Sequence, residues 1–243
     1  MHCVILAAGY GTRLQNDLTE EHKDLEGLPK ALLPLKGGCL LDRLLKWLPQ
    51  DIGKVVLVTN DIYHDQFVKH LEGTGITIIN DGTRTPEERL GAIGDLILGL
   101  DSLPEDDTMV LASDLLIPVS FEELHDLFES SRASVILTYH EPTATIHRKG
   151  VVEIEEDGRV VGFEEKPEKP KSRHAVCTVW LMERDVIEHI RDYQEQYPDK
   201  LDRPGDAMEY LIHQTPWYAY KQEDKVLDVA GLDTYEELAR EIK

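Results

Sequence analysis

Short apolar runs alternate with amphipathic stretches along the first half of the chain. Runs of Val, Ile and Leu predict buried strands, and apolar residues that recur every three or four positions predict helices. The expected strands span residues 2–7, 54–59, 76–80, 108–112 and 133–139. The expected helices span residues 40–48, 62–72, 90–101 and 121–131. This β-α-β rhythm, with strands that are apolar throughout, predicts an α/β fold with a Rossmann-like, mainly parallel sheet flanked by helices.

The rhythm changes after about residue 140. Residues 151–154 and 159–163 flank an Asp-Gly turn and predict a β-hairpin. Further strands are expected at residues 175–182, 217–220 and 226–229, and further helices at residues 185–196, 206–213 and 234–242. Because no linker or repeat interrupts the chain, we expect residues 1–243 to form a single domain. It would have a first half, residues 1–140, and a small β-rich half, residues 141–243.

The charge of the chain restricts its partners. The formal net charge is −21 at pH 7. Such a field repels phosphate backbones, so nucleic acid is not expected as a partner, and any phosphate site must be locally basic or assisted by a metal. The sequence has no apolar run of 18 residues and no basic segment before an apolar N-terminus. We therefore expect a cytoplasmic protein with no membrane partner.

The cysteines and histidines suggest no metal site by their spacing. Cys3, Cys39 and Cys177 form no CxxC pair and no Cys/His cluster at zinc spacing. Cys3 and Cys177 lie in apolar segments, so we expect small core side chains in a reducing compartment. No histidine lies in an HExxH pattern, and His70 falls in a polar helix.

A turn rich in small residues follows the first strand. The stretch from Leu6 to Leu14 reads LAAGYGTRL. It lacks the Lys-Ser/Thr pair of a P-loop and the third glycine of a dinucleotide fingerprint. Small side chains nevertheless let backbone N–H groups approach phosphate oxygens, and Arg13 adds a fork of donors suited to phosphate.

A second segment makes the interpretation of this turn more specific. Residues 29–35 read PKALLPL and follow the turn closely in sequence. Together the two segments resemble the N-terminal motifs of the sugar-1-phosphate nucleotidylyltransferases, and the resemblance extends over nearly the whole chain. Residues 163–167 resemble the F-x-E-K-P motif of that family, and Asp114 stands where the family has a metal ligand. The resemblance implies a nucleotide-binding half followed by an acceptor-binding half.

The resemblance also implies roles for particular residues. A nucleoside triphosphate and a sugar 1-phosphate would be the substrates, Mg²⁺ the cofactor, and a homo-oligomer is compatible with it. Three residues would be catalytic: Arg13, Lys30 and Lys166. Nucleotide-binding residues would be Leu6, Ala7, Ala8, Gly9, Gly11, Thr12, Arg13, Lys30 and Gly91. Acceptor-binding residues would be Gly150, Glu165, Lys166 and Thr178, and the metal ligands Asp114 and Asp228.

Two departures from the family pattern concern the acceptor. Thr178 stands where relatives often have Gly, and Asp228 is followed by Val-Ala-Gly-Leu instead of the usual [IV]-G-T-P. Two alternatives therefore stay open: a cytidylyltransferase that acts on a non-sugar phosphate or phosphonate, and a regulatory protein that binds sugar nucleotides without turnover. Residues 80–89 are expected near the base, but they do not distinguish uracil, thymine and cytosine.

Overall fold

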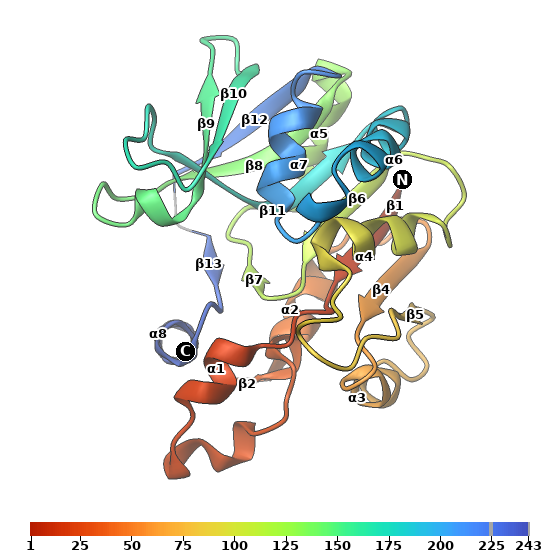
Figure 1. Cartoon of the computed structure of the whole chain (residues 1–243), viewed down its shortest axis with the longest axis vertical. Helices are drawn as coiled ribbons and strands as arrows, with labels where there is room; N and C mark the ends of the chain where they lie inside the picture. The colour runs from red at the N-terminus through yellow and green to blue at the C-terminus, as the bar shows by residue number, and fades with distance from the viewer. Residues whose placement is uncertain (224–225, 243) are drawn as a thin grey trace.

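A nine-stranded mixed sheet forms the centre of the computed structural model, which describes residues 1–223 and 226–242 (Figure 1). Its strands are β1 (His2–Leu6), β4 (Val55–Thr59), β5 (Thr77–Asn80), β6 (Thr108–Ala112), β8 (Ser134–His140), β9 (Gly150–Ile154), β10 (Val160–Glu165), β11 (His174–Met182) and β12 (Trp217–Gln222). Strands β6, β1, β4 and β5 are neighbours and all run parallel, as the sequence predicts.

Strand β11 separates the two parts of this sheet. It pairs antiparallel with β6 on one side and with β8 on the other, so the fifth predicted strand does not lie beside the fourth. Apolar runs predict that a strand exists, but they do not say which strand becomes its neighbour. On the β6 side, Val179 pairs with Leu111, and further along Ala175 pairs with Val151 of β9. The intervening residues 176–178 therefore face the space between the end of β6 and the β9–β10 hairpin.

Helices cover both faces of the parallel strands. Helices α2 (Leu40–Trp47), α3 (His64–His70) and α5 (Phe121–Ser131) contribute to one apolar core. Helices α4 (Gly91–Leu100), α6 (Val186–Gln196) and α7 (Pro204–Leu211) contribute to the other. Successive strand residues point to opposite faces, so Cys3 and Ile5 lie in the first core and Val4 in the second. The expected burial of Cys3 is thus confirmed.

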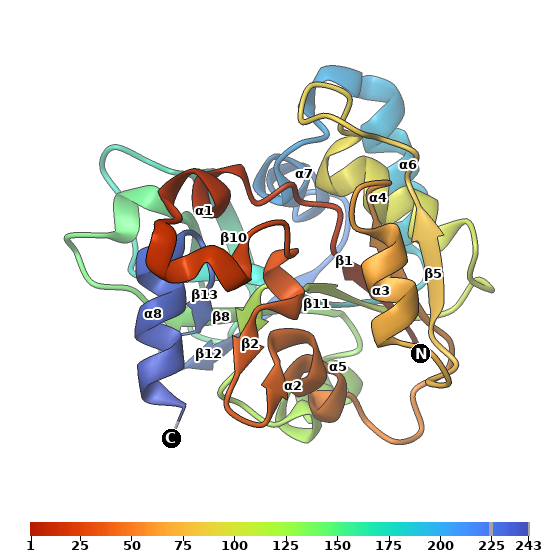
Figure 2. The same ribbon diagram turned by 90° about the horizontal axis from the view of Figure 1, so that it is seen from below.

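A third, smaller core joins the two ends of the chain. Helix α1 (Thr12–Asp17) and helix α8 (Leu232–Glu241) lie side by side in both views (Figures 1 and 2). Leu14 packs in this core with Val229 and Leu238, and the Tyr235 hydroxyl donates to the Pro34 carbonyl at 2.7 Å. The C-terminal segment is therefore held against the segment that follows the glycine turn.

The other predicted elements match the structure with small shifts at their ends. The helix expected at residues 206–213 begins two residues earlier, because Pro204 suits a first helical turn. Short elements escaped prediction: α1, the hairpin β2 (Pro34–Leu35) and β3 (Gly38–Cys39), and the strand β7 (Leu115–Leu116), which pairs with β13 (Leu227–Asp228). None of the helices within residues 1–223 and 226–242 has the length and apolar character that crossing a bilayer requires.

Candidate active site

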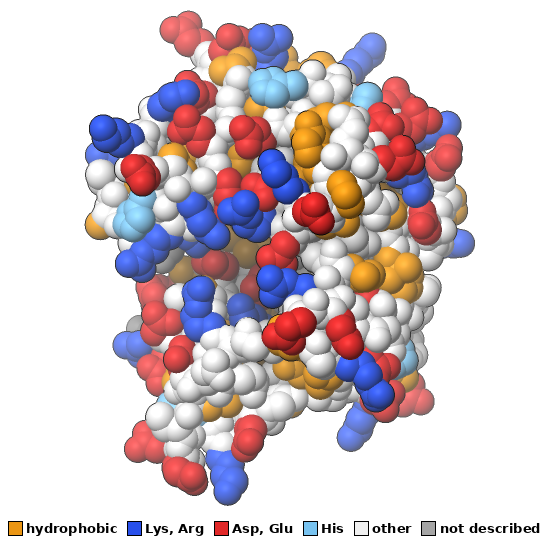
Figure 3. Space-filling model, viewed as in Figure 1, with side chains coloured by type: hydrophobic (Ala, Val, Ile, Leu, Met, Phe, Trp, Pro, Cys, Tyr) orange, Lys and Arg blue, Asp and Glu red, His pale blue; other side chains and the backbone are white. Residues whose placement is uncertain are grey.

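Two adjoining cavities open at the carboxyl ends of β1 and β6. The turn cavity, of about 320 Å³, is lined by the glycine turn, residues 29–31 and the start of α4. The hairpin cavity, of about 880 Å³, lies between the β9–β10 hairpin and helices α1 and α8. Residues lining both cavities are Ala112, Asp114, Thr178, Asp202 and Pro204. Figure 3 shows a hollow near the middle of this face with Lys and Arg side chains around its rim.

The glycine turn is fixed from behind by hydrogen bonds. The Ala7 amide donates to the Val58 carbonyl at 2.8 Å, and the Asn60 side-chain amide donates to the Ala8 carbonyl at 2.9 Å. Gly11 has a φ of 61°, a left-handed conformation that favours glycine, and α1 begins at the next residue. A Cβ on Gly9 would meet no atom within 4 Å. The turn is therefore rigid on its inner side and open on its outer side.

The structure places most of the predicted nucleotide-binding residues on the turn cavity. Those that line it are Leu6, Ala7, Ala8, Gly9, Gly11, Thr12, Lys30 and Gly91. Arg13 differs, because its position on α1 directs it to the hairpin cavity. Gly91 has a φ of 82°, and a Cβ there would lie 2.5 Å from the Leu201 carbonyl oxygen. Glycine at this position therefore also lets the 198–203 segment pack against the start of α4.

The two predicted metal ligands lie on neighbouring segments, Asp114 in the turn between β6 and β7 and Asp228 on β13. Asp228 is paired with Leu115 in the β7–β13 ladder, and the Val229 amide donates to the Asp114 carbonyl at 3.0 Å. Segments that are far apart in the sequence thus meet where β6 ends. Asp114 lines both cavities and Asp228 lines the hairpin cavity.

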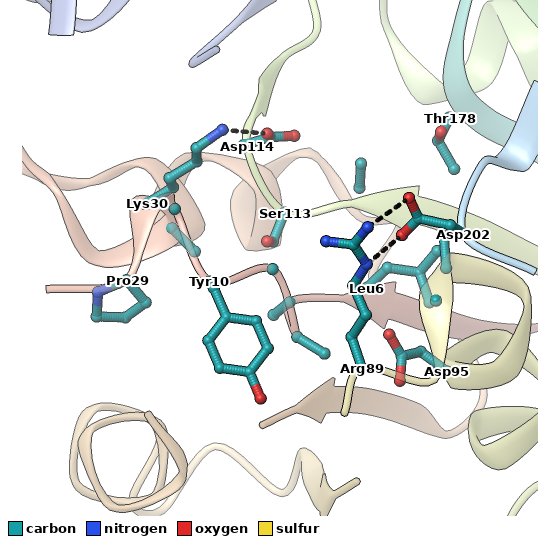
Figure 4. A pocket seen from close by; sticks show the side chains of 18 of the residues that line it. Leu6, Tyr10, Pro29, Lys30, Arg89, Asp95, Ser113, Asp114, Thr178 and Asp202 are labelled. Carbon is teal, nitrogen blue, oxygen red and sulfur yellow. Dashed lines mark hydrogen bonds and ion pairs between the residues drawn. The ribbon is translucent and has the colours of Figure 1, made fainter. Parts of the chain in front are cut away.

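Each of these aspartates is paired with a lysine. Lys30 Nζ lies 3.5 Å from Asp114 Oδ2, and Lys149 Nζ lies 2.9 Å from Asp228 Oδ1 (Lys30 and Asp114 in Figure 4). Burial raises the pKa of Asp114 above its usual range; Lys30 opposes this shift and the charge of Asp228 adds to it. Two hard carboxylates that repel each other at a cavity wall fit the donor set that Mg²⁺ prefers.

The four predicted acceptor residues line the hairpin cavity. The Glu165 side chain is 15% exposed and packs against Gly150 and Gly205, where a Cβ on either glycine would crowd its carboxylate. Lys166 has a φ of 49°, rare for a residue with a side chain, and its Nζ lies 3.4 Å from Glu165 Oε1. Such local strain is often found at functional sites. Thr178 lies where the two cavities meet.

Several charged residues of this site were given no role from the sequence. Arg148, Lys149 and Arg203 line the hairpin cavity, and Arg89 lines the turn cavity. Arg89 makes a two-pronged ion pair with Asp202, with Nε 2.8 Å from Oδ1 (Figure 4). The only local signal was adjacency, because Arg148 and Lys149 immediately precede the predicted Gly150.

Asp95 is a buried acid beside the turn cavity. Its exposed fraction is 7%, and its Oδ1 has no hydrogen-bond partner among the described residues. Burial, then the nearby charges of Asp81 and Asp202, raises the pKa of Asp95 to about 8. Asp95 is therefore largely protonated at neutral pH, and it can donate a hydrogen bond into the cavity.

Cys177 was expected in the core interior, but it lies at the wall of a cavity. It occupies the unpaired stretch of β11 and lines the hairpin cavity, although it also packs against core side chains. The cause is the insertion of β11, which leaves residues 176–178 without a neighbouring strand on the cavity side. Burial raises the pKa of the Cys177 thiol, so the thiol stays protonated.

Comparisons with known proteins identify the family of this chain. The nucleotidyl transferase family model matches residues 2–243. The chain is similar to a UTP–glucose-1-phosphate uridylyltransferase from a Synechocystis strain, with 26% identity over all of this chain and 65% of that protein. It is also similar to a glucose-1-phosphate thymidylyltransferase from Streptomyces antibioticus, with 27% identity over 87% of this chain and 57% of that protein.

For a further relative and a solved structure, the alignment with this chain covers more of the other protein. The glucose-1-phosphate thymidylyltransferase of Mycolicibacterium smegmatis is 25% identical over all of this chain and 85% of that protein. The crystal structure of a Bacillus anthracis protein assigned as a glucose-1-phosphate thymidylyltransferase aligns with a TM-score of 0.81. It covers 100% of this chain and 96% of that one at 21% identity, which supports the fold. The chain thus belongs to the nucleotidyl transferase family of enzymes.

Proposed function

We propose that this chain transfers a nucleoside monophosphate from a nucleoside triphosphate to a sugar 1-phosphate and releases pyrophosphate. The activities named for the three relatives support this class of reaction. One observation carries the proposal: Asp114, paired with Lys30, stands between a cavity lined by a glycine turn and a larger cavity lined by cations. The triphosphate would occupy the turn cavity and the acceptor the hairpin cavity.

The reaction joins two anions, so the protein must overcome their mutual repulsion. An oxygen of the acceptor phosphate attacks the α-phosphorus, and the bond from that phosphorus to the oxygen bridging to the β-phosphate breaks. The attacking oxygen already carries charge, so no general base is needed. The obstacles are repulsion and alignment, which positioning and electrostatic stabilisation overcome.

The residues divide this work between the cavities. In the turn cavity, the backbone at Gly9 and Gly11 and the Thr12 hydroxyl would bind the triphosphate, and Lys30 would approach its α-phosphoryl group. In the hairpin cavity, Lys166 would hold the acceptor phosphate, and Arg13 would neutralise phosphate charge. Glu165, seated between two glycines, would accept hydrogen bonds from hydroxyl groups of the acceptor.

The two aspartates would hold the divalent cation. Asp114 and Asp228 offer carboxylate oxygens from adjoining segments, and Mg²⁺ bound there would supply positive charge to phosphate oxygens. In the absence of the cation, Lys30 and Lys149 balance the negative charge of the two carboxylates. We expect both lysines to be drawn toward phosphate once a cation replaces them.

The test is a matrix of nucleoside triphosphates against phosphorylated acceptors, with Mg²⁺, read by pyrophosphate release. We expect release with at least one sugar 1-phosphate and its loss in Lys30→Met. Lys69→Met is the matched control, because Lys69 lies on α3 and lines neither cavity. Release only from CTP with a non-sugar phosphate would identify the cytidylyltransferase alternative. No release from any pair, with a sugar nucleotide still raising the unfolding temperature, would identify a non-catalytic binding protein.

A further inference from the structure

We propose that Cys39, Asp42 and His70 form a zinc-binding site that joins helix α2 to helix α3. The three residues come from two segments that are far apart in sequence. Cys39 ends β3 and precedes α2, Asp42 lies in the first turn of α2, and His70 is the last residue of α3. Their ligand atoms all lie within 4.8 Å of one another. None of the three lines the turn cavity or the hairpin cavity.

The distances within the cluster suit a metal ion at its centre. Cys39 Sγ lies 3.4 Å from His70 Nε2, and His70 Nε2 lies 2.8 Å from Asp42 Oδ1. Around a tetrahedral zinc ion, ideal bond lengths place a sulfur and a nitrogen ligand about 3.6 Å apart, and a nitrogen and an oxygen ligand about 3.3 Å apart. Of these two distances, the one between His70 and Asp42 departs more from the ideal value and has to widen by about 0.5 Å on this estimate. A small rotation of one partly exposed side chain provides this.

The set of ligand types points to zinc. Thiolate, imidazole and carboxylate are all zinc ligands, and the soft thiolate disfavours Mg²⁺ and Ca²⁺. Cys39 is 5% exposed, whereas the side chains of Asp42 and His70 are each 31% exposed. The thiol therefore forms the floor of the site and the other two ligands form its rim. A fourth position remains open toward solvent, where a water molecule would complete the tetrahedron.

The local backbone orients the carboxylate. The Cys39 amide donates to Asp42 Oδ2 at 2.8 Å, which leaves Oδ1 directed at His70. Gly38 makes this possible, because a Cβ at that residue would lie 2.4 Å from Asp42 Oδ2. Hydrogen bonds that fix a ligating carboxylate are a regular feature of metal sites. The cluster thus has an ordered ligand set and a supporting contact.

Co²⁺ provides a specific spectroscopic probe. The purified full chain is treated with a chelator, supplied with excess Mg²⁺ to saturate oxygen-ligand sites, and titrated with Co²⁺. We expect a thiolate-to-Co²⁺ charge-transfer band at one equivalent in the wild type. The band should persist in Cys177→Ser, which removes the partly exposed thiol of the hairpin cavity, and disappear in Cys39→Ser. Absence of the band in the wild type, or its persistence in Cys39→Ser, would overturn the proposal.

Zn²⁺ binding is measured separately by calorimetry, under the same Mg²⁺ background. His70→Gln should weaken the affinity for Zn²⁺ by at least about tenfold, whereas His64→Gln at the other end of α3 should leave it unchanged. The His70→Gln variant still tests the zinc site if Cys39→Ser fails to fold. Equal Zn²⁺ affinity in the wild type and His70→Gln would show that the cluster is only a hydrogen-bonded contact between two helices.

Discussion

The turn cavity and the hairpin cavity adjoin, but different parts of the chain build them. The turn cavity is walled by backbone and small side chains, and its two cations, Lys30 and Arg89, are each paired with an aspartate. The hairpin cavity has more than twice the volume. Its cations come from widely separated segments: Arg13, Arg148, Lys149, Lys166 and Arg203. We infer that the first cavity selects its ligand by shape and the second by charge.

The two cavities depend on each other through Asp114. This residue lines both, and the small core of Leu14, Val229 and Leu238 holds Asp228 on the adjoining strand. Substitutions that change the shape of the turn cavity should therefore affect nucleotide binding, and substitutions that change the charge of the hairpin cavity should affect acceptor binding. Substitutions of Asp114 should affect both.

The largest effect is expected from Asp114→Asn. It removes a metal ligand and the partner of Lys30, so kcat should fall about 10²- to 10³-fold, as for loss of one strong electrostatic stabiliser. Steady-state pyrophosphate release with each substrate varied in turn measures this. Asp65→Asn on the exposed face of α3 is the control and should retain full activity. A loss confined to KM for one substrate would separate the two cavities and contradict their link through Asp114.

Lys149→Met tests whether charge governs the hairpin cavity. The ion pair between Lys149 and Asp228 is partly buried, so the loss of Lys149 leaves the negative charges of Asp228 and Asp114 less well balanced. We expect kcat/KM for the acceptor to fall about 10- to 100-fold, equivalent to about 1.4–2.7 kcal/mol. Lys149→Arg should recover part of this loss.

The control for Lys149 is Lys171, which lies in the segment between β10 and β11. Lys171 is 60% exposed and pairs with Glu153 and Glu164 on the outer side of the β9–β10 hairpin. Lys171→Met should leave kcat/KM within about twofold of the wild type, because exposed ion pairs contribute little. If Lys149→Met and Lys171→Met gave equal losses, charge inside the cavity would not be the cause.

Asp95→Asn tests the buried acid of the turn cavity through the pH dependence of stability. The folded-state pKa of about 8 exceeds the ordinary value of 3.8, so the folded state binds the proton more tightly than the unfolded state. Protonated Asp95 therefore makes its full contribution to the unfolding free energy below the ordinary pKa, and this contribution is lost as pH rises toward 8. Between pH 6 and pH 8 the wild type should lose about 2 kcal/mol of unfolding free energy that Asp95→Asn does not lose. Denaturant unfolding at both pH values measures the difference, and parallel curves would show that Asp95 is ionised in the fold.

Sequence patterns predicted the parts of this molecule that are defined locally. Apolar runs located the strands, and the motif positions fell on the two cavities because backbone turns and strand ends are local features. Helix α1 was not predicted because its six residues, TRLQND, have one buried side chain, Leu14, and the core around Leu14 includes residues from the far end of the chain. For the same reason Lys149 gave no sign of its contact with Asp228, and the spacing of Cys39 and His70 gave no sign that they meet.

Gly9→Ala tests the role of shape in the turn cavity with the smallest change available. A Cβ at Gly9 meets nothing within 4 Å, so the variant should fold with unchanged stability while its methyl group occupies space meant for phosphate. We expect KM for the triphosphate to rise by a factor of up to about ten, or about 1.4 kcal/mol, with KM for the acceptor unaffected. Gly11→Ala provides the contrast, because its φ of 61° should cost about 1–2 kcal/mol of stability. Thermal unfolding and steady-state kinetics on both variants separate a lost fit from a strained backbone, and an unchanged KM in Gly9→Ala would mean that the triphosphate does not approach the turn.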